Sequence, residues 1–117
     1  MVPPAVRVYV CAVPADMRRS FDGLAAMTEQ IVKQDPLSGN LFVFCNKAAD
    51  RVKVLWWDRS GLCLWYKRLE LGAFRFPRHG EAAYEVEAAE LALILEGIEL
   101  SGAKRRPRFT PRVIQKP

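Results

Sequence analysis

The chain has 117 residues, of which 50% are hydrophobic and 26% are charged. This composition is typical of one folded domain and excludes both a disordered chain and a large enzyme with separate cofactor and substrate domains. The net charge is +5, which favours an anionic partner. We recognise no secretory signal and no apolar run near the roughly 20 residues of a membrane-spanning helix.

The first half of the chain predicts a strand, a helix and a second strand. Valines alternate with other residues over 6–11, which indicates a half-buried strand. Asp16 is expected to cap a helix over 17–33, whose apolar residues recur at helical spacing up to an Asp-Pro pair. The unbroken apolar run 41–45 is typical of a central strand that is covered on both faces.

Residues 52–57 and 62–69 predict a β-hairpin. We expect a three-residue loop between them, with Gly61 in the left-handed conformation. Asp58 then faces Leu62, and this register divides the side chains between two faces. One face is expected to be core and holds Val52, Val54, Trp56, Leu62, Leu64 and Tyr66. The other face mixes lysines with indoles and holds Lys53, Leu55, Trp57, Cys63, Trp65 and Lys67.

The last third of the chain predicts one more helix and a tail. Residues 71–77 are expected to form a turn and a short edge strand. An apolar stripe indicates a helix over 88–96, with Gly97 just past its end. Residues 104–117 are basic and rich in proline, which is typical of a flexible tail. We therefore predict an α+β domain over 1–103, with a small antiparallel sheet of about four strands, two packed helices and a basic C-terminal tail.

Charge is distributed in blocks along the chain. Residues 45–79 contain eight lysines and arginines against three acidic residues. Residues 80–103 contain six glutamates and no basic residue, whereas residues 104–117 contain six basic residues and no acidic one. Two basic blocks around an acidic one favour a polyanionic partner, of which nucleic acid is the commonest.

Few residues offer metal or nucleophilic chemistry. The three cysteines are far apart and form no C-x-x-C pair, so we expect reduced thiols in a cytoplasmic protein and no cofactor. His79 is the single histidine. The candidate ligands for Mg²⁺ are Asp16, Asp22, Asp50 and Asp58. Each has a simpler explanation: Asp16 as a helix cap, Asp50 and Asp58 as residues beside a loop or hairpin turn, and Asp22 as an ion-pair partner of Arg18 or Arg19. We therefore expect neither a metal site nor enzymatic activity.

Several stretches occur in an order that resembles a known family. They are Asp16-Met17-Arg18, Phe21-Asp22-Gly23-Leu24, Asp35-Pro36 with Gly39, Leu41 to Phe44, Lys53 to Asp58, Gly61 to Leu69, and Leu91 with Leu95 to Ile98. Over about residues 5–100 the chain resembles the accessory proteins of the insertion sequence 66 group of bacterial transposable elements, often called TnpB or Orf2. The resemblance implies a role beside a DDE-type transposase, but it does not imply a molecular activity.

The chain departs from the pattern of that family at two places. Ala48 and Ala49 interrupt a loop that is usually denser in basic residues. The last helix usually opens with threonine, whereas residues 87–90 here read Glu-Ala-Ala-Glu. A glutamate near a helix start still interacts favourably with the helix dipole.

The residues expected to contact nucleic acid lie in the hairpin and the tail. They are Lys53, Trp57, Trp65, Lys67, Arg68, Lys104, Arg105, Arg106, Arg108 and Arg112. Phosphate or partner contact is expected of Arg18, Arg19, Lys47 and Arg51. Lysines would hold phosphates while indoles stack on unpaired bases. The alternatives are that a helix covers the indoles, that the tail only aids solubility, and that the arginines only pair with nearby acids.

The sequence as a whole predicts a non-enzymatic accessory protein of transposition that binds DNA, with transposon ends, the transposase and co-encoded accessory proteins as partners. We expect it in the bacterial cytoplasm, associated with the nucleoid when bound to DNA. The alternative is a protein-interaction module that docks on the transposase through the acidic segment 87–99 and does not contact DNA.

The basic tail leads to a first prediction. A chain ending at Ala103 should fold normally, because the tail buries little surface. Its affinity for duplex DNA should depend less steeply on salt concentration. The slope of log affinity against log salt should be flatter by up to roughly 5, since each phosphate contact contributes about 0.9 to it. A salt titration of both chains measures this, and equal slopes would leave the tail with no role in DNA binding.

Overall fold

The structure is a computed structural model that describes residues 5–77 and 80–96. The basic tail, His79 and Gly97 lie outside these ranges, and so do the roles expected of them. The elements in chain order are β1 (Val8–Cys11), α1 (Phe21–Met27), the π-helix η1 (Thr28–Val32), β2 (Leu41–Cys45), β3 (Arg51–Trp57), β4 (Leu62–Arg68), β5 (Ala83–Val86) and α2 (Ala88–Glu96). In this part of the chain, no helix is long and apolar enough to span a membrane.

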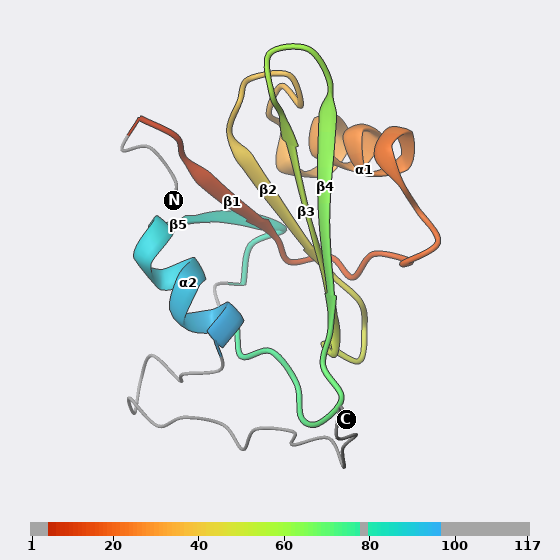
Figure 1. Ribbon diagram of the computed structural model, residues 1–117, viewed down its shortest axis with the longest axis vertical. Helices are drawn as coiled ribbons and strands as arrows, with labels where there is room; N and C mark the ends of the chain where they lie inside the picture. Colours follow the sequence, from red (N-terminus) through yellow and green to blue (C-terminus); the bar gives the residue numbers. More distant parts are fainter. Residues whose placement is uncertain (1–4, 78–79, 97–117) are drawn as a thin grey trace, which may run out of the picture.

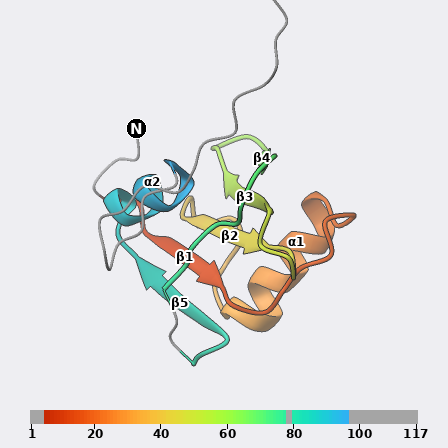
Figure 2. The ribbon, with the colours of Figure 1, turned by 90° about the horizontal axis from the view of Figure 1, so that it is seen from below.

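The architecture is one sheet between two helical layers. The sheet has five strands in the order β4-β3-β2-β1-β5, with β4 and β5 at opposite ends (Figures 1 and 2). Helix α1 and η1 cover one face, and α2 covers the other. The expectation of an α+β domain is confirmed, with α2 at the predicted residues and β2 central and buried on both faces.

The sheet is mixed rather than antiparallel, which corrects the sequence-based prediction. The chain leaves the end of β1, passes through α1 and η1, and returns to the start of β2, so β1 and β2 run parallel with Val8 opposite Leu41. The fifth strand, β5, pairs with the other side of β1. It was missed because it is short and lies within the acidic block. The segment 71–77, expected to contain an edge strand, contains none.

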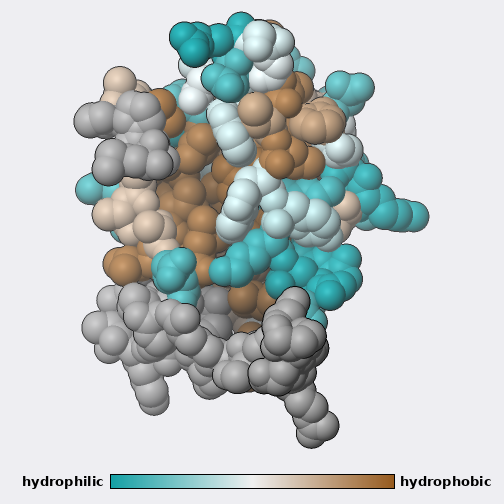
Figure 3. Space-filling model, in the orientation of Figure 1, coloured by the Kyte–Doolittle hydropathy of each residue, from teal (hydrophilic) through white to brown (hydrophobic). Residues whose placement is uncertain are grey.

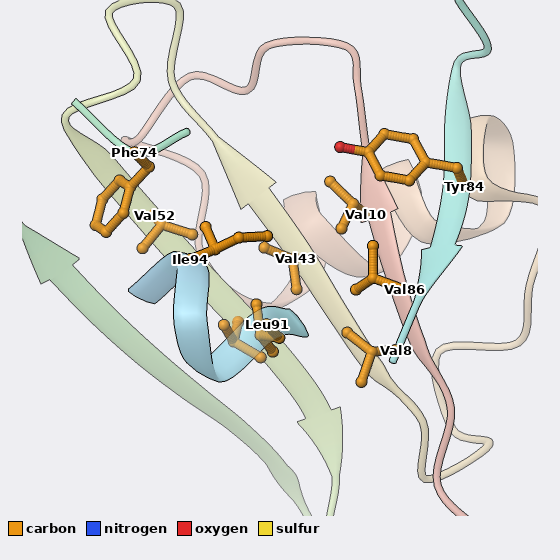
Figure 4. Close-up of a cluster of buried hydrophobic side chains, with 10 residues drawn as sticks. Val8, Val10, Val43, Val52, Phe74, Tyr84, Val86, Leu91 and Ile94 are labelled. Carbon is orange, nitrogen blue, oxygen red and sulfur yellow. The ribbon is translucent and has the colours of Figure 1, made fainter. Parts of the chain in front are cut away.

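Two hydrophobic clusters lie on either side of the sheet. The cluster under α2 comprises Val8, Val10, Val43, Val52, Val54, Phe74, Tyr84, Val86, Leu91 and Ile94 (Figure 4). The cluster under α1 and η1 comprises Cys11, Ala15, Leu24, Met27, Val32, Phe42, Phe44 and Leu55. Along β1, β2 and β3, neighbouring buried apolar residues belong to opposite clusters, as the pleat of a sheet requires.

The first helix begins later than predicted, and Asp16 does not cap it. Asp16 Oδ1 instead accepts a hydrogen bond of 2.8 Å from the backbone N–H of Arg18, within a turn that precedes the helix. Ser20 is the N-cap residue of α1. The helix widens into η1 at Thr28, whose buried hydroxyl donates to the carbonyl oxygen of Leu24 at 2.9 Å.

The β3–β4 hairpin has a register one residue away from the predicted one. The backbone N–H of Asp58 donates to the carbonyl oxygen of Gly61 at 2.8 Å, so only Arg59 and Ser60 form the loop. Arg59, with φ of 52°, takes the left-handed conformation that was expected of Gly61. Val54 therefore pairs with Trp65, and Lys53 pairs with Tyr66.

This shift by one residue exchanges the two faces of β4. Leu64 and Tyr66 lie on the α1 side of the sheet, whereas the prediction placed them beside Val54 and Trp56. Trp56 packs against the cluster under α2 as a partly buried side chain. The predicted single face of six core residues is therefore wrong for every residue that β4 contributes.

Candidate nucleic-acid interface

Lys53 is the centre of the basic side of the hairpin, and it is buried, with 6% of its surface exposed. Its Nζ donates one hydrogen bond of 2.8 Å to the carbonyl oxygen of Met17 and another of 2.8 Å to that of Arg19. The ammonium also lies 4.6 Å from the ring centroid of Tyr66. Lys53 therefore fastens the turn before α1 to the hairpin, and its ammonium is already occupied by these contacts.

Arg51, Tyr66 and Arg68 extend this arrangement to the surface. Arg51 Nη1 donates to the hydroxyl of Tyr66 at 3.2 Å. Tyr66 is 46% exposed. Arg51 and Arg68 are directly opposite each other across the two strands. Two like charges in this position destabilise a sheet, so the pairing has a cost that the fold alone does not explain.

The partners of these arginines reduce that cost only in part. Arg68 forms a salt bridge of 2.8 Å with Glu70. The hydrogen bond and the charge of Glu70 raise the pKa of the Arg68 guanidinium, and Tyr66 and then Asp50 raise it further. Within residues 5–77 and 80–96, Arg51 has no carboxylate partner.

The turn before α1 adds two arginines. Arg18 Nη2 and Asp16 Oδ2 form an exposed salt bridge of 2.6 Å. The hydrogen bond from Arg18 lowers the pKa of the Asp16 carboxyl to about 2. The stem of Arg19 lies over Gly23, where an added Cβ would meet it at 3.1 Å. Its carbonyl, held by Lys53, ties the position of this turn to the hairpin.

We define the basic surface as Arg18, Arg19, Arg51, Tyr66 and Arg68, with Lys53 beneath it. In the view of Figure 3, hydrophilic side chains lie at the hairpin tip and toward α1, while hydrophobic ones gather between α2 and the hairpin.

Lys47 is exposed in the β2–β3 loop. The side-chain oxygen of Asn46 fixes the shape of this loop by accepting hydrogen bonds of 3.1 and 3.0 Å from the backbone N–H groups of Asp50 and Arg51.

The remaining predicted residues of the hairpin are not part of this surface. Trp65 and Lys67 point to the α2 side of the sheet, whereas Trp57 points to the α1 side. The two indoles therefore do not form the shared platform that the predicted register implied. Lys67 Nζ donates to the carbonyl oxygen of Leu95 at 3.1 Å and so satisfies an acceptor in the last turn of α2.

Sequence reasoning overlooked Tyr66 as a surface residue because the loop length was misjudged by one. The exposed aromatic ring, and its contacts with Arg51 and Lys53, follow only from the observed register. Arg51 pairs with Arg68 only in the register in which Asp58 pairs with Gly61. No local pattern in the sequence distinguishes this register from the one shifted by one residue.

A hollow lies at the carboxyl ends of the parallel strands β1 and β2, where α/β proteins often hold ligands. It measures about 650 Å³ and is lined by Cys45, Asn46, Phe74, Glu81 and Tyr84, among others. Burial raises the pKa of the Cys45 thiol to about 11, which keeps it protonated and poorly nucleophilic near neutral pH.

The four aspartates considered for metal binding are occupied or scattered. Asp16 pairs with Arg18, Asp22 is exposed in the first turn of α1, Asp50 accepts from Asn46 Nδ2 at 2.8 Å, and Asp58 closes the hairpin loop. No three histidine, cysteine or acidic side chains lie together within the described ranges. The basic surface is therefore the strongest candidate site on this part of the chain.

Comparison with known proteins identifies the family. The family described as IS66 Orf2-like protein matches residues 6–105. The chain is 36% identical over 106 residues to the uncharacterized protein y4jC of Sinorhizobium fredii (strain NBRC 101917 / NGR234), covering 91% of each. It is 39% identical over 94 residues to y4hO of the same strain, covering 80% of this chain and 82% of the relative. No solved structure matches. The chain thus belongs to the IS66 Orf2-like family.

The role of Lys53 in the fold can be tested by Lys53→Met, which keeps the stem and removes the charged donor. The free energy of unfolding should fall by about 2–4 kcal/mol, because two carbonyl groups lose hydrogen bonds to a charged group. Urea denaturation measures the change. Lys47→Met, at an exposed position, should stay within about 0.5 kcal/mol of the native chain. Equal losses in the two variants would contradict the proposed fastening.

Tyr84 makes the free energy of unfolding depend on pH in the alkaline range. Burial, followed by the charges of Cys45 and Glu90, raises the pKa of the Tyr84 phenol from 10.0 to about 12. A raised native pKa favours the neutral form, so this contribution is complete below pH 10 and is lost as pH rises toward 12. Urea denaturation at several alkaline pH values should show a shallower decline for Tyr84→Phe than for the native chain. An identical decline would contradict this assignment.

Proposed function

We propose that this member of the IS66 Orf2-like family assists transposition by binding DNA through the basic surface. The family implies an accessory role in transposition of such elements, and binding to DNA at the transposon ends would be the means. The observation that carries the proposal is the pair of arginines, Arg51 and Arg68, opposite each other beside the exposed ring of Tyr66. A polyanion between the two guanidinium groups would relieve their repulsion.

Each residue of the surface would have a distinct part in the contact. The guanidinium groups of Arg51 and Arg68 would bind phosphates, which fixes the position of the backbone but carries no sequence information. Tyr66 offers a ring on which an unpaired base can stack. Lys53 holds that ring from beneath at 4.6 Å, so the ring is positioned before the nucleic acid arrives and little side-chain entropy is lost on binding.

Charges outside the hairpin would widen the contact. Arg18 and Arg19 lie on the turn that Lys53 fastens to β3, and Lys47 is exposed on the β2–β3 loop. The six basic residues of 104–117 would add long-range attraction. The transposase and the co-encoded accessory proteins would meet the chain on the same DNA, in the bacterial cytoplasm.

A second candidate function is docking on the transposase through α2. This helix presents Leu93, which is 37% exposed, and the exposed Glu96, and the exposed Glu87 directly precedes its first residue. Glu90 serves the helix itself, because its Oε1 accepts a hydrogen bond of 3.1 Å from the backbone N–H of Glu87. A basic surface of the transposase would suit the acidic side of α2.

The DNA-binding proposal can be tested with Arg51→Gln, assayed by a salt titration of binding to transposon-end DNA without the transposase. The variant should bind more weakly, and its log–log slope should be flatter by about 0.9 if Arg51 contacts one phosphate. The matched control is Arg7→Gln, which removes the same charge from an arginine paired with Glu85 at the opposite end of the sheet.

The control should leave affinity and slope nearly unchanged. Equal effects of the two variants would mean that only net charge matters and that the basic surface has no special role. Absence of any binding by the native chain, together with co-purification of the transposase, would favour docking through α2 instead.

A further inference from the structure

Strand β4 is a long, open edge of the sheet. It has seven residues and ends the strand order, and no strand within residues 5–77 and 80–96 pairs with its outer side. The other edge strand, β5, has four residues and carries the acidic side chain Glu85. Natural proteins shorten or charge the edges they keep unpaired, whereas long apolar edges recruit another strand. The apolar side chains Trp65 and Tyr66 are 39% and 46% exposed on β4.

The hairpin shows which backbone groups of β4 are free to pair. The N–H of Asp58 bonds to Gly61 at 2.8 Å and the N–H of Leu69 bonds to Asp50 at 2.7 Å, which fixes both ends of the ladder. Hydrogen-bonded pairs alternate in an antiparallel ladder. The alternate residues direct their N–H and C=O groups away from β3, and these are Leu62, Leu64, Tyr66 and Arg68.

We propose that β4 pairs antiparallel with β4 of a second copy of this chain, with Trp65 of each copy on the two-fold axis. In this register Leu64 lies opposite the other copy's Tyr66, and Leu62 lies opposite its Arg68. All four outward-directed residues of each strand then form hydrogen-bonded pairs. Shifting one strand by two residues in either direction leaves one of these four residues without a hydrogen-bonded partner. Shifting it by one residue places outward-directed backbone groups opposite residues whose backbone groups point toward β3.

The side chains favour this register as well as the backbone. Trp65 meets its copy at a non-hydrogen-bonded position, where side chains approach most closely and aromatic pairs stabilise a sheet. Lys67 meets Cys63, and Arg68 meets Leu62, so no two like charges are opposite each other. A strand with its two basic residues at one end is therefore complementary to itself only when it runs antiparallel.

Such a dimer goes beyond the proposed DNA contact and does not depend on it. The two sheets would form one continuous sheet, with the basic surfaces of both copies on the same face because Tyr66 and Arg68 point to the α1 side. A two-fold symmetric pair of basic surfaces suits a two-fold symmetric polyanion, of which duplex DNA is one.

The test uses the full chain with Cys63→Ser, which removes the native thiol of this edge. Adding Trp65→Cys places two thiols on the axis at a Cα separation of about 4.5 Å, within the range of a disulfide. Mild oxidation should then give a covalent dimer in high yield. Tyr66→Cys in the same background is the control, because its copy lies diagonally at about 7–8 Å and should cross-link poorly.

Light scattering across a range of protein concentrations gives a second readout. Trp65→Lys opposes two ammonium groups on the axis and should abolish dimers, whereas Leu93→Lys, at a residue of similar exposure (37% against 39%), should not. A native chain that stays monomeric at every concentration would overturn the proposal, and so would equal cross-linking of the Trp65→Cys and Tyr66→Cys variants. So would a dimer that only Leu93→Lys disrupts, since that dimer would use α2.

Discussion

One ammonium group holds together three segments that are distant in the sequence. Lys53 Nζ binds the carbonyl oxygens of Met17 and Arg19 and lies under the ring of Tyr66. Burying a lysine is costly unless its charge is satisfied, and here two carbonyl dipoles and an aromatic face satisfy it. The turn before α1 is consequently held against β3 and the ring of Tyr66 through one side chain, and the shape of the basic surface depends on it.

Periodicity sufficed for the elements whose own residues decide their form. The helix over Ala88–Glu96 and the doubly covered strand Leu41–Cys45 were predicted from apolar spacing alone. The start of α1 was misplaced because the Asp16 carboxylate can accept a hydrogen bond in a turn as readily as at a helix start, and here it does so in a turn that Lys53 contacts. The parallel pairing of β1 and β2 depends on the helical connection that returns the chain to the end of the sheet where β1 starts, and no local pattern encodes that path.

The candidate site was predictable in its composition but not in its arrangement. The sequence showed that Arg51, Lys53 and Arg68 lie in a basic block, and all three lie on the α1 side of the hairpin. It did not show that Lys53 is buried, since a lysine between two valines reads as the solvent side of an amphipathic strand. Lys53 is buried because it lies beside Phe44 of the neighbouring strand and because the turn at Met17 covers it.

The pairing of Asp58 with Gly61 at the hairpin loop determines which face of the sheet each side chain of β4 occupies. A slip of that pairing by one residue, with Asp58 opposite Leu62, would turn every side chain of β4 to the opposite face while leaving β3 in place. Tyr66 and Arg68 would then lie on the α2 side, and Trp65 and Lys67 would lie on the same side as Arg51. The closure of a two-residue loop therefore determines the chemistry of a surface several residues away.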